Sequence, residues 1–164
     1  MKIGFSYPKK FKIGAFLISW WTKRPYSHVY IEIPIRSLSR DTVYHAAHGS
    51  VHFRAKEKFL RENNTVVEYE LDVDRELRLK VLDKCIELAG EDYGYIELAK
   101  IFLMDICHYF KCKFIDVNGD GKGYICSELI GDLLLTLGYE IKKPLHLLKP
   151  NDIEEILQNG KTKA

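Results

Sequence analysis

Apolar and polar residues alternate in the first half of the chain, as they do in half-buried β-strands. In residues 26–35, positions 29, 31, 33 and 35 are apolar and fall on one face, while His28, Tyr30 and Glu32 fall on the other. Shorter strands are predicted at 42–46 and 50–54, joined by a turn at His48-Gly49-Ser50, and at 65–71. Residues 1–12, interrupted by Pro8, are predicted to form an irregular or edge segment.

The second half shows helical spacing instead. Apolar positions 77, 81, 85 and 88 predict a helix capped by Asp72 or Asp74, ended by Gly90, with Cys85 in the core. Further helices are predicted at 95–109, from Cys126 with apolar positions 130, 133, 134 and 137, and after Pro150 with Asn151 as its cap. Residues 13–21 are predicted to be a buried first strand or helix. Early strands and late helices predict an α+β domain, an antiparallel sheet with helices packed on it.

Length and composition narrow the class of protein. The 164 residues suit a single domain spanning 1–164. A net charge of +2 gives no electrostatic case for nucleic acid or an anionic membrane as the main partner. The apolar run 13–21 is too short to span a bilayer and lacks a signal cleavage site. The default expectation is a cytoplasmic protein with four reduced cysteines and no transmembrane segment; action elsewhere would need non-classical release, as for a phage-encoded enzyme.

The candidate nucleophile is Cys126, which follows a glycine-rich loop and begins a helix. The first amide groups of a helix have no internal partner and carry partial positive charge, which favours a thiolate over a thiol. Thiolate is the reactive form of cysteine. The alternative is a small buried residue that only fills space in the core.

The candidate base is His28, because an imidazole can take the thiol proton and later return it to a leaving group. The alternative is a polar residue on the solvent side of its strand. If His28 meets Cys126, the alternation requires the Cys126 helix to pack on the strand face that carries Tyr30 and Glu32.

Two short blocks, Ser27-His28-Val29-Tyr30-Ile31-Glu32 and Tyr124-Ile125-Cys126-Ser127-Glu128-Leu129, resemble the permuted papain-like cysteine hydrolases of the NlpC/P60 superfamily. The likeness is greatest to the YiiX/YaeF-like branch, which is related to the lecithin-retinol acyltransferase group. Further similar segments make the likeness extend over residues 13–157; they are Val43-Tyr44-His45-Ala46, Gly90-Glu91-Asp92-Tyr93-Gly94 and Lys149-Pro150-Asn151-Asp152-Ile153.

The resemblance implies a papain-like fold with Cys126 as nucleophile, His28 as base and His45 as the residue that orients His28. His48 and Glu32 remain alternatives for that third position. The amide of Cys126 is a candidate oxyanion donor, and Tyr93 and Tyr124 are candidates for substrate or oxyanion binding. Many relatives have glycine in place of Tyr30. Family members often have glutamate in place of His45, and the acyltransferase branch has histidine.

Two segments contain residue types that bind metals. Asp116-Val117-Asn118-Gly119-Asp120-Gly121 resembles the start of a calcium-binding EF-hand loop, but the twelfth position is Ser127 and not glutamate, which favours a tight turn. Cys107, His108 and Cys112 lack a fourth ligand at a spacing typical of zinc. No metal or organic cofactor is expected.

These patterns predict a hydrolase that cleaves an amide or ester through an acyl-enzyme. The resemblance implies peptide, peptidoglycan or acyl-lipid substrates. An acyltransferase or lipid acyl hydrolase, and a non-catalytic binding module on the same fold, are the alternatives.

Overall fold

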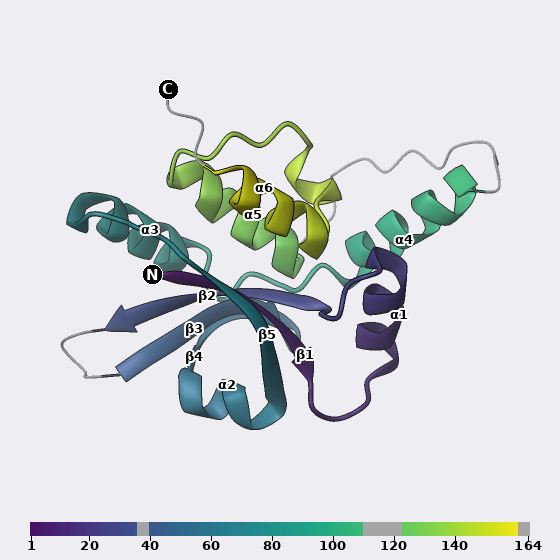
Figure 1. The fold of residues 1–164 in the computed structure, drawn as a ribbon, viewed down its shortest axis with the longest axis horizontal. Coiled ribbons are helices and arrows are strands. Elements are labelled where there is room, and N and C mark those ends of the chain that lie inside the picture. Colours follow the sequence, from purple (N-terminus) through teal and green to yellow (C-terminus); the bar gives the residue numbers. More distant parts are fainter. Residues whose placement is uncertain (36–39, 110–122, 161–164) are drawn as a thin grey trace.

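A five-stranded antiparallel sheet forms the centre of the fold (Figure 1). The computed structural model describes residues 1–35, 40–109 and 123–160. The strand order is β4-β3-β2-β1-β5, and every neighbouring pair is antiparallel. The strands are β1 (Lys2–Pro8), β2 (His28–Ile35), β3 (Arg40–Ala47), β4 (Ser50–Ala55) and β5 (Asn63–Glu70).

Strand β1 is a central strand, so the prediction of an irregular or edge segment at residues 1–12 is wrong. It pairs with β2 on one side and β5 on the other, and Ile3 lies opposite Ile31 and Tyr69. Ile3 and Phe5 are buried. Pro8 does not disrupt the strand because it stands at its last position, where the sheet tolerates a missing N–H.

Six α-helices in the described part of the chain flank the sheet, and the predicted α+β class is confirmed. The helices at α3, α4, α5 and α6 were predicted from apolar spacing; α2 was not, because it has only two turns and Phe59 is its one buried residue. The helices are α1 (Ile13–Thr22), α2 (Lys56–Glu62), α3 (Arg75–Glu87), α4 (Tyr95–Tyr109), α5 (Cys126–Thr136) and α6 (Pro150–Asn159), with a short 3-10 turn at Leu145–Leu147.

The helix starts show which caps form. Of the two candidates for α3, Asp74 is the cap, because its side chain accepts a hydrogen bond from the Leu77 N–H at 2.8 Å. Asn151 does not cap α6, because Pro150 is already the first helical residue and Lys149 holds the cap position. The carboxylate of Asp152 accepts the Lys149 N–H at 2.7 Å instead.

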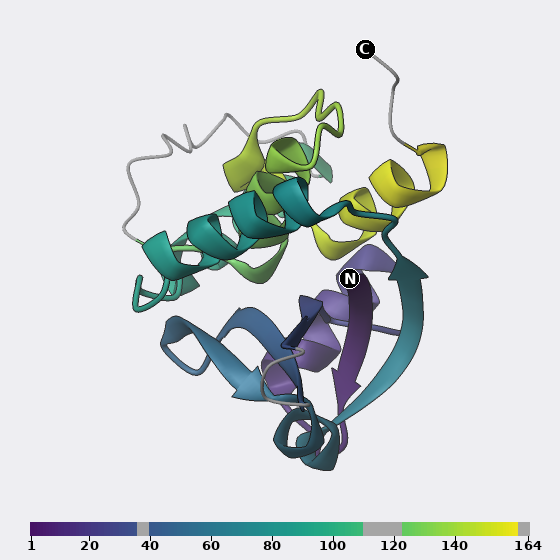
Figure 2. The same cartoon turned by 90° about the vertical axis from the view of Figure 1, so that its left-hand side faces the viewer.

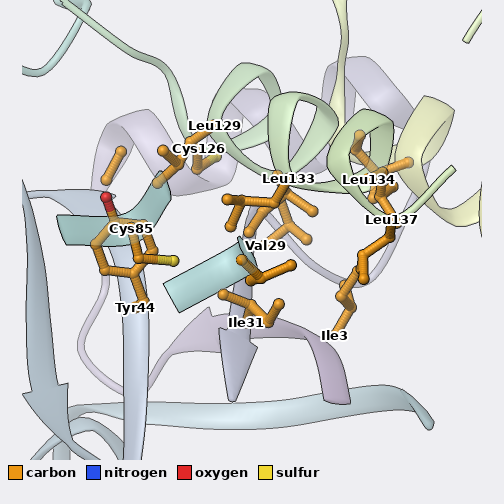
Figure 3. Packing of buried hydrophobic residues seen from close by; sticks show 14 of the residues in the cluster. Ile3, Val29, Ile31, Tyr44, Cys85, Cys126, Leu129, Leu133, Leu134 and Leu137 are labelled. Atoms are coloured by element: carbon orange, nitrogen blue, oxygen red, sulfur yellow. The ribbon is translucent and has the colours of Figure 1, made fainter. Parts of the chain in front are cut away.

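The main core lies between β2 and α5 (Figure 3). Leu133 of α5 points toward Val29 and Ile31 of β2, Leu129 lies beside Cys126, and all five residues are buried. Helix α5 therefore packs on the strand face opposite to the one that a Cys126–His28 meeting was expected to require. The face expected from that meeting carries the polar residues of the strand. The apolar helix instead buries more apolar surface against the valine and isoleucine of the other face.

The opposite face of β2 is covered by α2. Tyr30 and Phe59 are both buried there, and their ring centroids lie 4.6 Å apart. The Tyr30 ring also crosses Gly4 of β1, where an added Cβ would meet Tyr30 Cζ at 2.2 Å. The space left by Gly4 thus accommodates the Tyr30 ring.

Helices α1 and α4 lie side by side at one end of the sheet (Figure 1), and α3 lies toward the opposite end, nearest the viewer in Figure 2. The Trp21 indole N–H donates to Asp105 at 2.7 Å, and the Trp21 ring meets Phe102 edge to face at 5.4 Å. Segment 13–21 is therefore a helix, but none of the residues of α1 is buried. The prediction that this segment is a buried core element is wrong.

Candidate functional site

A cavity of about 330 Å³ lies at the end of the sheet where β2 begins and β3 ends. Its walls come from both strands, from the N-terminal half of α1, from Phe59 of α2 and from the start of α4. Three of the predicted site residues line it, namely His28, His45 and Tyr93. The antiparallel pairing of β2 and β3 is what brings the two histidines, 17 residues apart in sequence, to one place.

The two histidines are within hydrogen-bond distance. His28 Nε2 and His45 Nδ1 are 3.0 Å apart, and the two rings meet edge to face. The Phe59 ring lies 5.3 Å from the His45 ring, which is buried. Because Nε2 of His28 is occupied by His45, the Nδ1 atom of His28 is the nitrogen left for other chemistry.

The alternatives to His45 are placed differently. Glu32 is buried and forms a 2.6 Å ion pair with Lys56 of α2. His48 is exposed at the β3–β4 turn, where its φ is 55°. His48 still lines the cavity, but the hydrogen bond to His28 is made by His45.

Both histidines are held in their neutral forms. Burial lowers the pKa of His28 to about 4, with further lowering from His48, Lys12 and His52. Burial also lowers the pKa of His45 far below its usual range, and the neighbouring His28 and His52 add to the effect. Among the described residues, no carboxylate is a cause of either shift, and the neighbouring charged groups named for each histidine lower its pKa further.

Cys126 is the first residue of α5, as the sequence predicts, but its surroundings do not favour a thiolate. Its side chain is only 5% exposed. Burial raises the pKa of the Cys126 thiol, although the backbone N–H groups of Val29, Ser127 and Cys126 itself oppose the rise. The expected helix-end effect exists, but the loss of hydration around the sulfur outweighs it.

The sulfur of Cys126 lies beside the first peptide of β2. The Val29 N–H that faces it belongs to the peptide bond joining His28 to Val29. Within the described residues, no hydrogen bond joins the side chains of Cys126 and His28. Cys126 borders a separate space of about 10 Å³, and this space shares Ile18, Ser27 and Leu98 with the histidine cavity.

The two candidate tyrosines differ in position. Tyr93 lines the cavity, and burial, together with Cys126 and Tyr95, keeps its pKa well above the usual range, so its hydroxyl stays a hydrogen-bond donor. Tyr124 is bound through its backbone, whose N–H donates to the Asp92 carbonyl at 2.8 Å. Its side chain packs against the main core and is not among those lining the cavity.

Several cavity residues were not singled out from the sequence. Phe59 was missed because α2 carries no periodic signal, and Ile18 and Leu98 because apolar residues on helices read as ordinary packing. Lys12 lowers the pKa of His28 from the segment preceding α1. A basic residue just ahead of an apolar helix gave no indication that it would lie near a histidine on another strand.

The metal hypotheses find no support in the described ranges. There, no three His, Cys, Asp or Glu side chains converge in a way that would hold a metal ion. The candidate calcium loop 116–121 and Cys112 lie outside the described residues, as does the side chain of His108. Within the same ranges, no helix has both the length and the apolar character needed to cross a bilayer.

No protein-family model matches the chain, and a search of curated proteins finds no significant relative. The resemblance to NlpC/P60 hydrolases is therefore a hypothesis that rests on the short motifs around His28 and Cys126.

Proposed function

We propose that the chain is a cysteine hydrolase of the permuted papain-like type, with Cys126, His28 and His45 as its reacting and positioning residues. The observation that carries the proposal is the His28–His45 pair in a cavity next to a cysteine that begins a helix. Nucleophile, base and orienting residue form such a chain in many acyl-transfer enzymes. The helix start places backbone N–H groups beside the sulfur, where they favour the thiolate, and during attack such a group could turn to the carbonyl oxygen, on which negative charge develops.

The direction of the pKa shifts sets the form of the proton transfer. With a raised thiol pKa at Cys126 and a lowered imidazole pKa at His28, the resting site contains a neutral thiol and a neutral imidazole. As Sγ attacks the carbonyl carbon, its proton passes to His28 Nδ1. The tetrahedral intermediate then expels the amine or alcohol, which takes that proton, and water resolves the thioester by the same route to give a free acid.

His45 has a defined part in this scheme. For His28 Nδ1 to accept a proton, the hydrogen on that ring must sit on Nε2 and point at His45 Nδ1, 3.0 Å away. His45 thus holds His28 in the tautomer that can act as a base. In the described structure, His45 Nε2 is buried and has no hydrogen-bond partner, so the pair is not continued to a carboxylate.

Access to the sulfur requires movement of two side chains. Ile18 of α1 and Leu98 of α4 border both the cavity and the small space beside Cys126. A shift of these side chains would join the two spaces. Because the His28 ring lies on the Phe59 side of β2 and Cys126 packs with Val29 on the other side, the ring would also have to turn toward the sulfur. Catalytic contacts are often loose in ligand-free enzymes, and they tighten when substrate binds.

The test is hydrolysis of activated esters, such as p-nitrophenyl acetate and butyrate, followed by intact-mass detection of an acyl adduct. We expect an adduct at Cys126 that Cys126→Ala removes. His28→Gln should lower kcat/KM by at least about a hundredfold, since a positioned base contributes about 10²–10⁴. His45→Gln should have a smaller effect of about tenfold.

Matched controls come from the same chain. Cys107→Ser removes a thiol on α4, and His146→Gln removes a half-exposed imidazole on the 3-10 turn, so both should keep full activity. In the wild type, kcat/KM should fall on the acid side near pH 4 and not near 6.5, because His28 is protonated only below about 4. Turnover that survives in Cys126→Ala, or acylation of Cys107 in its place, contradicts the proposal.

An acyltransferase is the second candidate, and the partner found for His28 favours it. That partner is His45, the residue type that the acyltransferase branch of the suggested family has. Adding a primary amine should then divert the acyl group from acid to amide product. A protein that forms neither product nor adduct would instead be the non-catalytic binding module.

A further inference from the structure

Helix α1 exposes an unusual amount of apolar surface. Seven of its ten residues are Ile, Ala, Phe, Leu or Trp, yet none of the ten is buried. Trp20 is 66% exposed and Phe16 49%, and Phe11, just before the helix, is 73% exposed. Monomeric soluble proteins rarely expose contiguous apolar surface of this kind without a binding role.

Helix α4 continues this surface. Tyr95, Ile96, Leu103 and Ile106 of α4 are also exposed. The two helices are joined through Trp21 and line a shared, largely apolar groove together with Leu17 and Phe102. The exposed side chains thus belong to one corner of the molecule, the α1–α4 face, which lies at the end of the sheet in Figure 1.

The charge around this face is positive. Residues 9–24 contain five Lys or Arg and no Asp or Glu. Lys10, Lys12 and Lys23 are exposed at the two ends of α1, and in the described residues none of the three has an ion-pair partner. The acidic residues of α4 are engaged elsewhere, since Glu97 pairs with Lys100, and Asp105 binds Lys149 and Trp21.

We propose that the α1–α4 face docks on an anionic membrane surface. An apolar helix with aromatic residues on its exposed side and lysines at its ends suits the lipid interface, where rings enter the headgroup region and cations meet anionic headgroups. A second copy of the chain is a poorer occupant, because a symmetric contact would bring the two sets of lysines together. The docking does not depend on Cys126 being a nucleophile.

The helices of the α1–α4 face also line the histidine cavity. Gly14, Ala15 and Ile18 of α1, and Tyr95 and Leu98 of α4, line the histidine cavity. The helices that would touch the lipid therefore also form the cavity wall. Docking would set the cavity next to the membrane.

The test is co-sedimentation of the full chain with vesicles of phosphatidylcholine alone or with about 30% phosphatidylglycerol. We expect binding to the anionic vesicles, weakening with added salt, and a blue shift in tryptophan emission as Trp20 leaves water. Trp20→Ser with Phe16→Ser should lower the partition coefficient by at least about tenfold. Lys10→Gln with Lys23→Gln should lower it by about 25-fold, or about fivefold for each charge.

The matched control is a pair of equally exposed apolar residues on α3, since Leu79 is 57% and Ile86 67% exposed. Leu79→Ser with Ile86→Ser should bind vesicles like the wild type. Cys126→Ser should also bind fully, so that loss of activity and loss of docking are separate results. Absence of binding to both vesicle types overturns the proposal. So does a stable dimer in solution that Phe16→Ser disrupts, because the face would then be a contact between copies.

Discussion

Helices α1 and α5 are similar in length and in apolar content, but they have opposite relations to the core. α5 has eleven residues, of which seven are buried, and it covers β2. α1 has ten residues, and none of them is buried. The difference lies in what each helix packs against. α5 meets the valine and isoleucine face of a central strand, whereas α1 meets the side of α4, the rim of a cavity and, through Trp21, the side chain of Lys149.

The comparison shows that apolar residues in a helix do not by themselves locate the core. In α5 the buried leucines contribute to folding stability, since their exposure to water on unfolding is unfavourable. In α1 the same residue types already face water in the folded state, so they add little to stability. Selection for some other property is the simplest reason to keep them.

The largest expected contrast is between core truncations in the two helices. Leu133→Ala in α5 should lower the free energy of unfolding by about 2–5 kcal/mol, because Leu133 is fully buried against β2. Phe16→Ala in α1 should change it by about 0.5 kcal/mol or less. Urea denaturation of both variants measures the contrast, and equal losses would show that α1 is part of the core.

Lowering the pH should destabilise the fold through the buried histidines of the cavity and not through α1. The unfolded chain binds protons at His28 and His45 from about pH 6.5 downward, whereas the folded chain resists protonation of His28, whose pKa is lowered, until about pH 4. Stability should therefore be complete above about pH 6.5 and fall on acidification, by up to about 1.4 kcal/mol per pH unit for each imidazole.

Denaturant midpoints between about pH 7 and pH 4.5 measure this slope. His45→Gln should reduce this slope, while Phe16→Ala should leave it unchanged. A slope that is the same in His45→Gln and the wild type would show that the buried histidine does not resist protonation.

The smallest expected difference in stability is between alanine substitutions at the single glycine of each helix. A Cβ added at Gly14 of α1 meets nothing within 4 Å, so Gly14→Ala should stabilise by about 0.4–1 kcal/mol. At Gly131 of α5 the Cβ would stand 2.5 Å from Leu148 Cδ1, and packing strain should cancel or reverse that gain. Thermal melts of the two alanine variants measure the difference, and an equal gain at both sites would contradict it.

Much of the fold follows from spacing in the sequence. The strands β2 to β5 and the helices α3 to α6 lie close to their predicted ranges, because long periodic patterns report directly on which side is buried. The central position of β1 could not be read, since strand order depends on pairings between distant segments. The face of β2 on which α5 packs was predicted only on the condition that His28 meets Cys126, and burial on both faces of β2 means that alternation alone does not decide it.

The candidate site was partly predictable. His45 was expected as the partner of His28 from the resemblance, and the structure adds the reason, because β2 and β3 are neighbours and both side chains lie on the same face. The protonation state of Cys126 could not, because it depends on how deeply the sulfur is buried and not on its place in a helix. The role of Ile18 and Leu98 as walls between sulfur and cavity required the packing of α1 against α4.

The central place of β1 also bears on how the chain assembles during synthesis. β1 leaves the ribosome before the other four strands, but its two neighbours are β2 and β5, and β5 ends at Glu70. One edge of β1 must therefore wait, unpaired, until the chain has been extended through β5. Closing so long a loop is slow, and an open edge of this kind is where nascent chains associate wrongly.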